Sequence, residues 1–328
     1  MKRLSLKLAA LAVVGAFAAS PVLAQKANWP KSLTLGTASV GGTFYIYGQV
    51  WANIAGDAID LPISTQQTQG PNQNIILVDS KQVELGMTTM GVALQAWNGK
   101  EKWTQGKKFR NIRAMFPMYD TSFQCVTTDR TGITSFEQLN GKNVGVGPRA
   151  GTPGTYMPMF FETLGVKPAA IRYGGASDMG NQLGDGLLDA FCFAAGIPIS
   201  AFSEIEAQRS VVFFTFTKAQ IDKLMKAMPE LSPATIPAGT YKTLKEDQHT
   251  VGVFNFAIAH KDLPDDLVYG IVKAVMENPQ RMVQGHSAAR ETVPQAASKN
   301  SFLLWHPGAA KYFREKGIKI DEKLAPKS

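Results

Sequence analysis

The chain has 328 residues, of which 45% are hydrophobic and 18% are charged, and its formal net charge is +8. A chain of this length can bury two cores of ordinary domain size. Its Lys and Arg residues are scattered along the sequence, which excludes the clustered basic stripe that is typical of nucleic-acid-binding proteins.

The first 24 residues have the pattern of a secretory signal peptide. Lys2, Arg3 and Lys7 give a positively charged start, and an apolar run follows over residues 8–19. Residues 22–24 then have the small-residue pattern of a signal-peptide cleavage site. The alternative is an uncleaved membrane anchor, which needs about 18 apolar residues where this run has about a dozen. We therefore expect cleavage after Ala24 and a mature chain of charge +5 that is located in the periplasm or outside the cell.

After the signal, short apolar strands alternate with polar or glycine turns and with helical apolar spacing, as in βαβ architectures. We expect strands at residues 33–37, 61–65 and 83–88, with helices at 44–55, 72–80 and 92–98. A second set of the same parts follows, with strands at 122–128, 143–147, 171–173 and 190–194 and helices at 135–139, 156–164 and 179–185. This rhythm predicts two similar α/β units in tandem.

The end of the chain offers one more strand, at 252–259, and then helices at 265–277 and 307–316 that have no strand partners of their own. In the simplest arrangement the chain crosses to the second unit near Tyr119 and returns near Thr250, and its C-terminal helices complete the first unit. We therefore expect an α/β protein with lobe 1 formed by residues 25–118 plus 252–328 and lobe 2 by residues 119–251. Two hinge crossings join the lobes and leave a central ligand cleft between them.

The loops expected at this cleft are rich in glycine and in hydroxyl side chains. Ligands of open α/β sheets lie beyond the carboxyl ends of the strands, where glycines let backbone N–H groups approach them and hydroxyls donate or accept hydrogen bonds. The candidates are Ser39, Gly42, Thr43, Thr88 and Thr89 in the first unit and Gly151, Thr152, Thr155, Ala195, Gly196 and Pro198 in the second. The pattern favours a small carboxylate that is held by amides and hydroxyls.

Three further side chains are candidates for ligand contact. The guanidinium of Arg149 can grip a carboxylate in a two-pronged fork, and the alternative is a surface arginine that faces water. One of Phe44 and Tyr45 has to face the core of the first helix, and we assign Tyr45 to the pocket. Gln66, Gln67 and Gln69 form a polar loop in which at least one glutamine is a candidate for ligand contact, and we take Gln67; the alternative is a plain polar loop.

Cys125 and Cys192 each lie in an apolar, strand-like run. A disulfide is permitted outside the cytoplasm if the two strands are neighbours, and a pair of buried free thiols is the alternative. The four histidines are dispersed without metal-ligand spacing, so we expect no metal and no cofactor.

An enzyme, such as a secreted hydrolase, is the alternative from another functional class. The sequence contains no G-x-S-x-G nucleophile elbow, and its GPRAGTPGT loop lacks the Lys-Ser/Thr ending of a phosphate-binding P-loop. We therefore expect a binding protein and no catalytic residues.

Seven segments occur together in order: GTASVGGTFYIYG, TQGPNQNI, ELGMTTMGVALQAWNG, GPRAGTPGT, DAFCFAAGIP, PATIPAGTY and LWHPGAAKYFREKGI. In these segments the chain resembles the TAXI family, the solute-binding subunits of TRAP-type transporters. The resemblance implies a two-lobed periplasmic binding protein of type II topology, in agreement with the two crossings, and a protein that acts as a monomer. It also implies that the closed form delivers glutamate, 2-oxoglutarate or a related dicarboxylate to the membrane subunits of a TRAP transporter.

The same resemblance places ligand contacts at Ser39, Gly42, Thr43 and Tyr45 and at Gly151, Thr152, Thr155 and residues 195–198. Three positions depart from the family pattern: Thr89 stands where glutamine is common, Phe44 replaces a tyrosine, and the loop with Arg149 is one residue longer. Arg149 favours a dicarboxylate over a neutral amino acid. The sequence leaves open whether the closed form is presented to a transporter or to a sensor kinase.

Overall fold

The computed structural model describes residues 28–326, so the expected export signal at residues 1–24 lies outside the described part of the chain. Over residues 28–326, none of the helices combines the length and the apolar character that a membrane span requires.

One ten-stranded sheet runs through the described residues, in the order β2-β1-β3-β10-β4-β7-β5-β6, with β8 paired to β4 and β9 to β10. The strands are β1 (Leu33–Gly36), β2 (Ile63–Gln66), β3 (Leu85–Thr89), β4 (Ile112–Thr128), β5 (Asn143–Gly145), β6 (Ala170–Arg172), β7 (Ala190–Ala195), β8 (Val211–Phe214), β9 (Ser232–Ile236) and β10 (Gln248–His260). β1, β2 and β3 pair in parallel at one end and β5, β6 and β7 at the other, whereas β4 and β10 pair antiparallel between them.

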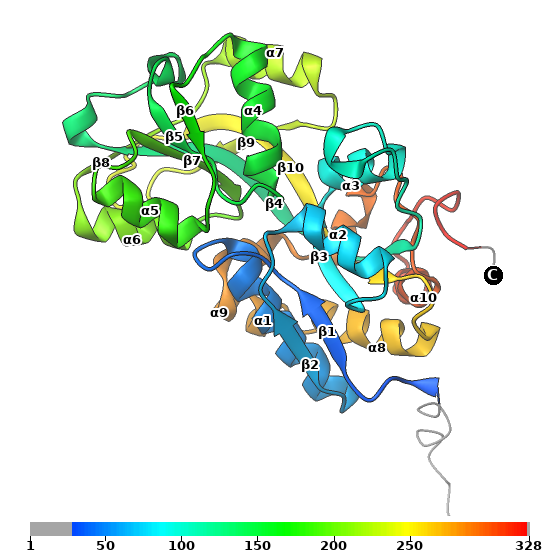
Figure 1. The fold of residues 1–328 in the computed structure, drawn as a ribbon. Coiled ribbons are helices and arrows are strands. Elements are labelled where there is room, and N and C mark those ends of the chain that lie inside the picture. The colour runs from blue at the N-terminus through cyan, green and yellow to red at the C-terminus, as the bar shows by residue number, and fades with distance from the viewer. Residues whose placement is uncertain (1–27, 327–328) are drawn as a thin grey trace, which may run out of the picture.

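Helices divide the molecule into two lobes (Figure 1). Lobe 1 holds β1 to β3 with α1 (Thr43–Ile59), α2 (Pro71–Asp79), α3 (Met90–Asn98), α8 (Asp265–Met276), α9 (Pro279–Gly285) and α10 (Pro307–Glu315). Lobe 2 holds β5 to β9 with α4 (Thr152–Leu164), α5 (Ala176–Gly184), α6 (Ser200–Gln208) and α7 (Lys218–Ala227). α8 packs against both α1 and α10, so these C-terminal helices lie beside the first helix of the chain.

β4 and β10 are the two long strands that connect the lobes (Figure 1). The expected strand at 122–128 is only the second half of β4, because the strand continues backward through Pro117 to Ile112. Pro117 pairs with Phe256 beside a register shift between Phe254 and Phe256, and an irregular ladder tolerates the missing N–H of a proline. The expected lobe boundaries, at 118/119 and 251/252, fall inside these two strands and stay a prediction.

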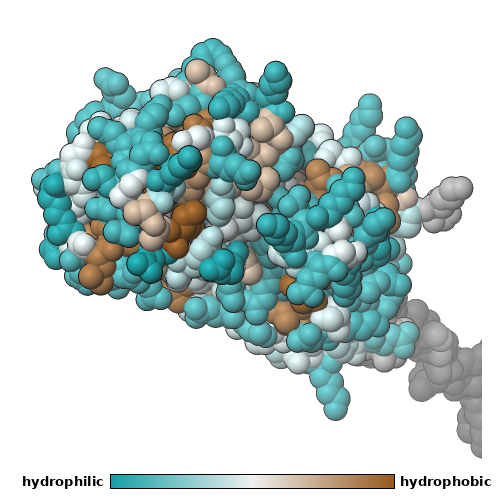
Figure 2. All heavy atoms as spheres, turned by 45° about the horizontal axis from the view of Figure 1, so that its top comes forward, coloured by the Kyte–Doolittle hydropathy of each residue, from teal (hydrophilic) through white to brown (hydrophobic). Residues whose placement is uncertain are grey.

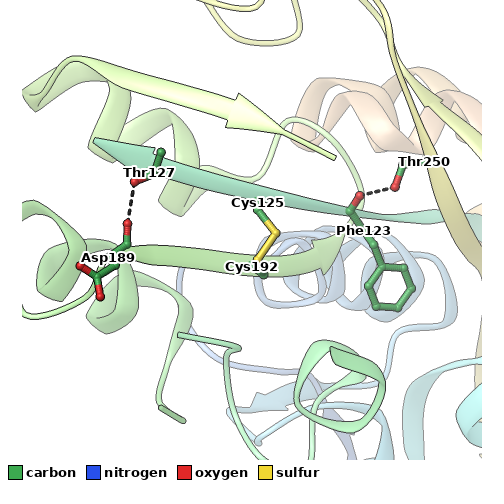
Figure 3. The surroundings of a disulfide bond; sticks show 6 residues. All are labelled: Phe123, Cys125, Thr127, Asp189, Cys192 and Thr250. Carbon is green, nitrogen blue, oxygen red and sulfur yellow. Dashed lines mark hydrogen bonds between the residues drawn. A yellow bond between two sulfur atoms is a disulfide. The ribbon is translucent and has the colours of Figure 1, made fainter. Parts of the chain in front are cut away.

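Cys125 and Cys192 form a disulfide, which decides between the two sequence alternatives. They lie directly opposite each other on the antiparallel strands β4 and β7, and both are buried (Figure 3). Two hydrogen bonds flank the bridge: Thr127 donates from β4 to the Asp189 carbonyl, and Thr250 donates from β10 to the Phe123 carbonyl. The bridge therefore ties the centre of the sheet together within lobe 2.

The sequence reading missed several short elements, namely α6, α7, α9, β8 and β9, and residues 136–139 form a 3₁₀ turn instead of an α-helix. α7 buries only Ile221 and Leu224, so its apolar period is short and its polar residues dominate. β9 contains Pro233, which is tolerated because β9 pairs on only one side, with β10.

The surface in Figure 2 is mostly hydrophilic, with small hydrophobic spots that are separated from one another. The large hydrophobic side chains exposed within the described range are Val40, Ile46, Ile76, Leu187 and Val293. They belong to different segments of the chain, and single exposed apolar residues of this kind are ordinary for a soluble surface.

Candidate functional site

A cavity of about 40 Å³ lies where the two lobes meet. Lobe 1 contributes Ala38, Ser39, Gly42, Thr43, Phe44, Gln69, Gly70 and Pro71, and the remaining lining residues are Thr121, Pro148, Gly151, Thr152, Pro153, Phe193, Ala194 and Ala195.

Two helices, one from each lobe, begin at this cavity. Gly42 precedes α1 and Gly151 precedes α4, and neither helix has a side-chain cap. The N–H groups of Thr43, Phe44 and Thr152 donate to no acceptor within residues 28–326. Free first-turn N–H groups and the positive end of the helix dipole favour an anion, so both lobes present an anion-binding helix end to the same small space.

The polar side chains of the cavity are neutral. The Thr43 hydroxyl donates across the cleft to the Gly196 carbonyl, and Thr152 donates to the Thr89 hydroxyl at 3.4 Å. No charged side chain of the described chain is among the lining residues. A bound anion would therefore rely on backbone N–H groups and helix dipoles instead of an arginine or lysine.

The rest of the lining is apolar. Phe44 of α1 and Phe193 of β7 supply two aromatic rings from opposite lobes, and Pro148, Pro153 and Ala194 fill the space between polar groups. Both rings are largely buried, Phe44 at 8% and Phe193 at 5% exposure. The cavity thus combines uncapped helix ends with an apolar wall.

Beside the cavity, residues 38–42 of lobe 1 dock against lobe 2, and we call this segment the latch loop. The N–H of Ser177 in α5 donates to the Val40 carbonyl at 3.2 Å, and the N–H of Ala201 in α6 donates to the Gly41 carbonyl at 3.1 Å. Gly41 has φ +85°, and a Cβ there would collide with the Ser177 hydroxyl. The latch loop therefore caps two helix N-termini of the opposite lobe, which requires glycine at position 41.

On the other side of the cavity, α2 of lobe 1 meets the loop before α4. The N–H of Asn72 donates to the Ala150 carbonyl at 3.3 Å, and the N–H of Ala150 donates to the side-chain oxygen of Gln69 at 3.3 Å. A Cβ on Gly70 would lie 3.1 Å from the Gly151 Cα, so the two backbones are in close contact. Hydrogen bonds between the lobes on both sides of the cavity show that the cleft is closed in this structure.

Two acidic side chains lie at the crossing of β4 between the lobes. The N–H of Asp120 donates to a carboxylate oxygen of Glu291 at 2.8 Å, and the Asp120 Oδ1 atom is buried without a hydrogen-bond partner in the described chain. Burial, with a smaller contribution from the Glu291 charge, raises the pKa of the Asp120 carboxyl to about 6. Burial also raises the pKa of Glu291.

The sequence model of the NMT1-like family matches residues 35–317, which is most of the chain. The chain belongs to the NMT1-like family. This match covers both lobes, and the TAXI resemblance of the sequence stays a prediction.

Solved structures show that this NMT1-like chain has the two-lobed, type II periplasmic-binding-protein fold. It is similar to the periplasmic binding protein BugD, with a TM-score of 0.57 and 13% identity over 89% of this chain and 100% of that one. It is also similar to MatC from Rhodopseudomonas palustris with bound malate, with a TM-score of 0.57 and 11% identity over 87% and 96% of the chains. The expected α/β architecture, with two lobes and two crossings, is thereby confirmed.

The structure brings six of the predicted site residues of this NMT1-like chain to the cavity. They are Ser39, Gly42, Thr43, Gly151, Thr152 and Ala195. Three more predicted residues lie one contact away: Thr89 accepts from Thr152, Gly196 accepts from Thr43, and Thr155 donates to the Gly151 carbonyl. Their contact with a ligand stays a prediction.

Five predicted residues, Tyr45, Gln67, Thr88, Arg149 and Pro198, are not part of the cavity lining. Arg149 is exposed, and its guanidinium stacks on the Tyr173 ring at 3.9 Å, as in the surface alternative for this residue. Gln67 is also exposed, and the Thr88 hydroxyl donates to the Thr89 carbonyl. Phe44 lines the cavity in place of Tyr45, because Phe44 shares the buried face of α1 with Tyr47 and Trp51.

The sequence reading did not assign Gly70, Pro71, Thr121 or Phe193 to the site, and it took Gln67 as the candidate from a loop in which Gln69 is the glutamine that lines the cavity. The pair Gly70-Pro71 is a usable signal, because glycine followed by proline commonly starts a helix, and α2 begins there. Thr121 and Phe193 lie inside strands that read as plain core, and only the meeting of β4 and β7 brings them to the cavity.

Proposed function

We propose that this protein is a periplasmic solute-binding protein that captures a small carboxylate by closure of its two lobes. The observation that carries the proposal is the pair of uncapped helix N-termini, α1 from one lobe and α4 from the other, that face one closed cavity. A carboxylate contacts both helix ends only in the closed form, so binding favours closure.

The proposal includes the lobe division at residues 118/119 and 251/252 and rotation of the lobes about β4 and β10. Hinge closure around a ligand is a standard movement of two-lobed binding proteins. It also includes delivery of the ligand by a monomer to the membrane subunits of a TRAP-type transporter, which the TAXI-like segments of the sequence support. Removal of the signal after Ala24 and release into the periplasm belong to the same proposal.

The proposed ligand class is a carboxylate, with no catalysis and no cofactor. Two independent lines support it: the uncapped helix ends at the cavity and the MatC structure, which was solved with bound malate. Glutamate, 2-oxoglutarate and related dicarboxylates are the candidates that the sequence resemblance supplies.

A thermal-shift screen followed by calorimetry tests the proposal. The protein is exported to the periplasm of an expression host, purified, and dialysed extensively to remove any acid that co-purifies with it. A ligand at 100 times its dissociation constant adds about 2.7 kcal/mol to the free energy of unfolding, which is a clear rise in melting temperature. We expect such a rise for at least one small carboxylate, and its absence for mono-, di- and aminocarboxylates alike would contradict the proposal.

The transport step is tested separately with membrane subunits reconstituted in vesicles. Uptake of the calorimetrically identified acid is expected only when the binding protein is present outside the vesicles. Ligand binding without uptake would instead support presentation of the closed form to another membrane receptor, such as a sensor kinase.

A further inference from the structure

We propose that His286 is a positioning residue for ligand binding: its neutral imidazole holds the loop at residues 196–198 in the closed form and so slows release of the ligand. The inference rests on the proposed function, since this loop directly follows Ala195, which lines the cavity. His286 itself lies outside the cavity lining. Its contacts, its protonation state and its surroundings carry the inference.

The loop at residues 196–198 turns successive carbonyls toward lobe 1. The Gly196 carbonyl accepts from the Thr43 hydroxyl at the start of α1, and the Ile197 carbonyl accepts from the Ser287 hydroxyl at 3.4 Å. Ser287 lies two residues after the end of α9, which packs on α1. Lobe 1 therefore holds this loop of lobe 2 from two separate elements.

The next carbonyl, that of Pro198, is the acceptor for His286. The His286 side chain forms a hydrogen bond with the Pro198 backbone, which lacks an N–H and can only accept. The Nδ1 atom of the ring accepts from the N–H of Ala288 at 3.1 Å, so the proton of the neutral ring is on Nε2 and is donated to Pro198. A second proton, on Nδ1, would face the Ala288 N–H and break that bond. The neutral ring therefore satisfies both partners, and the charged ring does not.

Gly196 packs closely on β4 and on the segment that follows His286. A Cβ on Gly196 would lie 2.6 Å from the Tyr119 ring and 2.9 Å from the Ala288 Cβ atom. Because so little space is left there, a displacement of His286 and Ala288 is transmitted to Gly196. The Gly196 carbonyl is the group that the Thr43 hydroxyl contacts at the cavity.

The charged groups around His286 come from the elements that pack there. α9 and β4 pack against the 3₁₀ turn at Ser287–Glu291, and α9 also packs on α1. The charged residues that these elements place there are Asp57 of α1, Arg281 of α9, Asp120 of β4, and Arg290 and Glu291 of the turn itself. Arg281 pairs with Asp57 at 3.1 Å, whereas burial raises the pKa of Asp120 and of Glu291 toward the range in which a histidine titrates. A test of His286 therefore has to compare variants that keep both acids.

The protonation of His286 gives the closed form a pH dependence. Burial lowers the pKa of His286 from its ordinary value of 6.5, and the bond to Pro198 offsets only part of this change. The closed form therefore binds fewer protons than a form in which the ring is in water. Closure is favoured at pH values above 6.5 and is weakened as the pH falls below this value.

Stopped-flow fluorescence and calorimetry on the full exported protein test the inference. The probe is whichever of acetate, malate, succinate, glutamate and 2-oxoglutarate raises the melting temperature most. His286→Asn keeps an N-cap acceptor for the Ala288 N–H but is too short to reach the Pro198 carbonyl, and His286→Ser replaces it if it does not fold. At pH 7.5 we expect the dissociation rate constant to rise about fivefold to tenfold and the association rate constant to stay within about twofold, because the lost bond exists only in the closed form. Ser287→Ala should raise the dissociation rate constant about threefold.

The same measurements at pH 5.0 test the neutral ring. The ratio of wild-type to His286→Asn affinity should decrease about threefold or more from pH 7.5 to 5.0, since Asp120, Glu291 and the probe titrate alike in both proteins. His249→Gln, which replaces an exposed histidine of lobe 2, is the control and should match the wild type at both pH values. An unchanged dissociation rate in the folded His286 variant, a loss confined to association, or a ratio that is independent of pH overturns this inference and leaves the proposed function standing. No binding of any acid overturns both.

Discussion

Helix N-termini at the junction of the lobes fall into two groups. In α2, α5 and α6, a first-turn N–H donates to a carbonyl of the opposite lobe, from Asn72, Ser177 and Ala201 respectively. In α1 the N–H groups of Thr43 and Phe44, and in α4 that of Thr152, find no acceptor within the described chain, and these two helices begin at the cavity. Backbone N–H groups at helix N-termini thus serve two purposes. Those that donate to a carbonyl of the opposite lobe hold the lobes together, and those without a protein acceptor are available to bind an anion.

Because of this difference, both the hydrogen bonds between the lobes and a bound ligand can stabilise the closed form. A typical hydrogen bond contributes about 1 kcal/mol net, because the open form exchanges it for a bond to water. The few bonds between the lobes therefore favour closure only modestly. An anion that bridges α1 and α4 adds charge-assisted bonds that exist only in the closed form.

The largest expected effect comes from Gly41→Ala, which disrupts the hydrogen bonds that the N-termini of α5 and α6 donate to the latch loop. Gly41 has φ +85°, and an added Cβ would collide with the Ser177 hydroxyl and lie 2.8 Å from the Ser177 nitrogen. The latch loop then cannot cap α5 and α6, and we expect ligand affinity to fall at least 100-fold, about 2.7 kcal/mol, by calorimetry. Small-angle scattering should show a more open molecule.

Gly132→Ala is the matched control for this variant. Gly132 has φ +66°, and a Cβ there would meet no atom within 4 Å, so the control carries the backbone strain without a clash between the lobes. Equal loss of affinity in the two variants would attribute the effect to strain and not to the latch loop.

Asp120→Asn tests a buried acceptor without a donor, whereas the N–H groups at the cavity are donors without an acceptor. The unpartnered acceptor is Asp120 Oδ1. The folded pKa of about 6 exceeds the ordinary value of 3.8, so between these pH values the folded protein keeps a proton that the unfolded chain releases. The free energy of unfolding therefore decreases as pH rises from about 4 to 6, and the ionised group costs about 2–3 kcal/mol above that window. We expect Asp120→Asn to match the wild type near pH 4 and to melt at a higher temperature at pH 7.5.

Thermal melts at several pH values check this prediction, with Asp129→Asn as the control, since Asp129 is an exposed acid in the same part of the chain. A stability difference between Asp120→Asn and the wild type that does not change with pH would contradict the raised pKa.

Thr43→Val tests the hydrogen bond that the Thr43 side chain donates across the cleft at the cavity. The substitution keeps the shape of the residue but removes the hydroxyl that donates to the Gly196 carbonyl. We expect about tenfold weaker ligand binding, since the closed form loses a bond and leaves a buried carbonyl unpaired, at a cost of about 1–1.5 kcal/mol. Calorimetry measures the change, and the exposed Thr65 of β2, replaced by valine, serves as the control.

Arg149→Ala has the smallest expected effect. It distinguishes the ligand contact that the sequence suggested for Arg149 from the surface position that the structure gives it. Because Arg149 stacks on Tyr173 outside the cavity, we expect the ligand affinity to stay within twofold of the wild type. Arg110→Ala is matched to it, since Arg110 stacks on Trp97 at 3.8 Å in lobe 1. A tenfold loss that is confined to Arg149→Ala would show that this guanidinium reaches the ligand.

The sequence predicted the βαβ parts and the glycine loops well, because apolar runs and glycine positions are local signals. It also led to Ser39, Gly42, Thr43, Gly151 and Thr152, all of which line the cavity. These residues occupy the starts of helices, where sequence pattern and backbone position are tightly coupled.

The direction of individual side chains was harder to predict. In the loop before α4, Pro148 lines the cavity while its neighbour Arg149 points to solvent, and no sequence period distinguishes two adjacent loop residues. In α1 the information was present: Phe44, Tyr47 and Trp51 follow helical spacing and share one buried face, so Phe44 and not Tyr45 belongs with the interior. β4 begins earlier than the expected strand at 122–128, because it runs back through Pro117 to Ile112, where a neighbouring register shift accommodates the proline.

The unbroken course of β4 and β10 has a consequence for the entropy of binding. Two domains on a flexible linker sample many relative orientations and lose that freedom when a ligand fixes them together. Here two long strands, paired on both sides of their register shifts, run from one lobe to the other, which restricts the lobes to bending or twisting about these strands. The open molecule has few orientations to give up, and most of the favourable contact energy of a small ligand can appear as affinity.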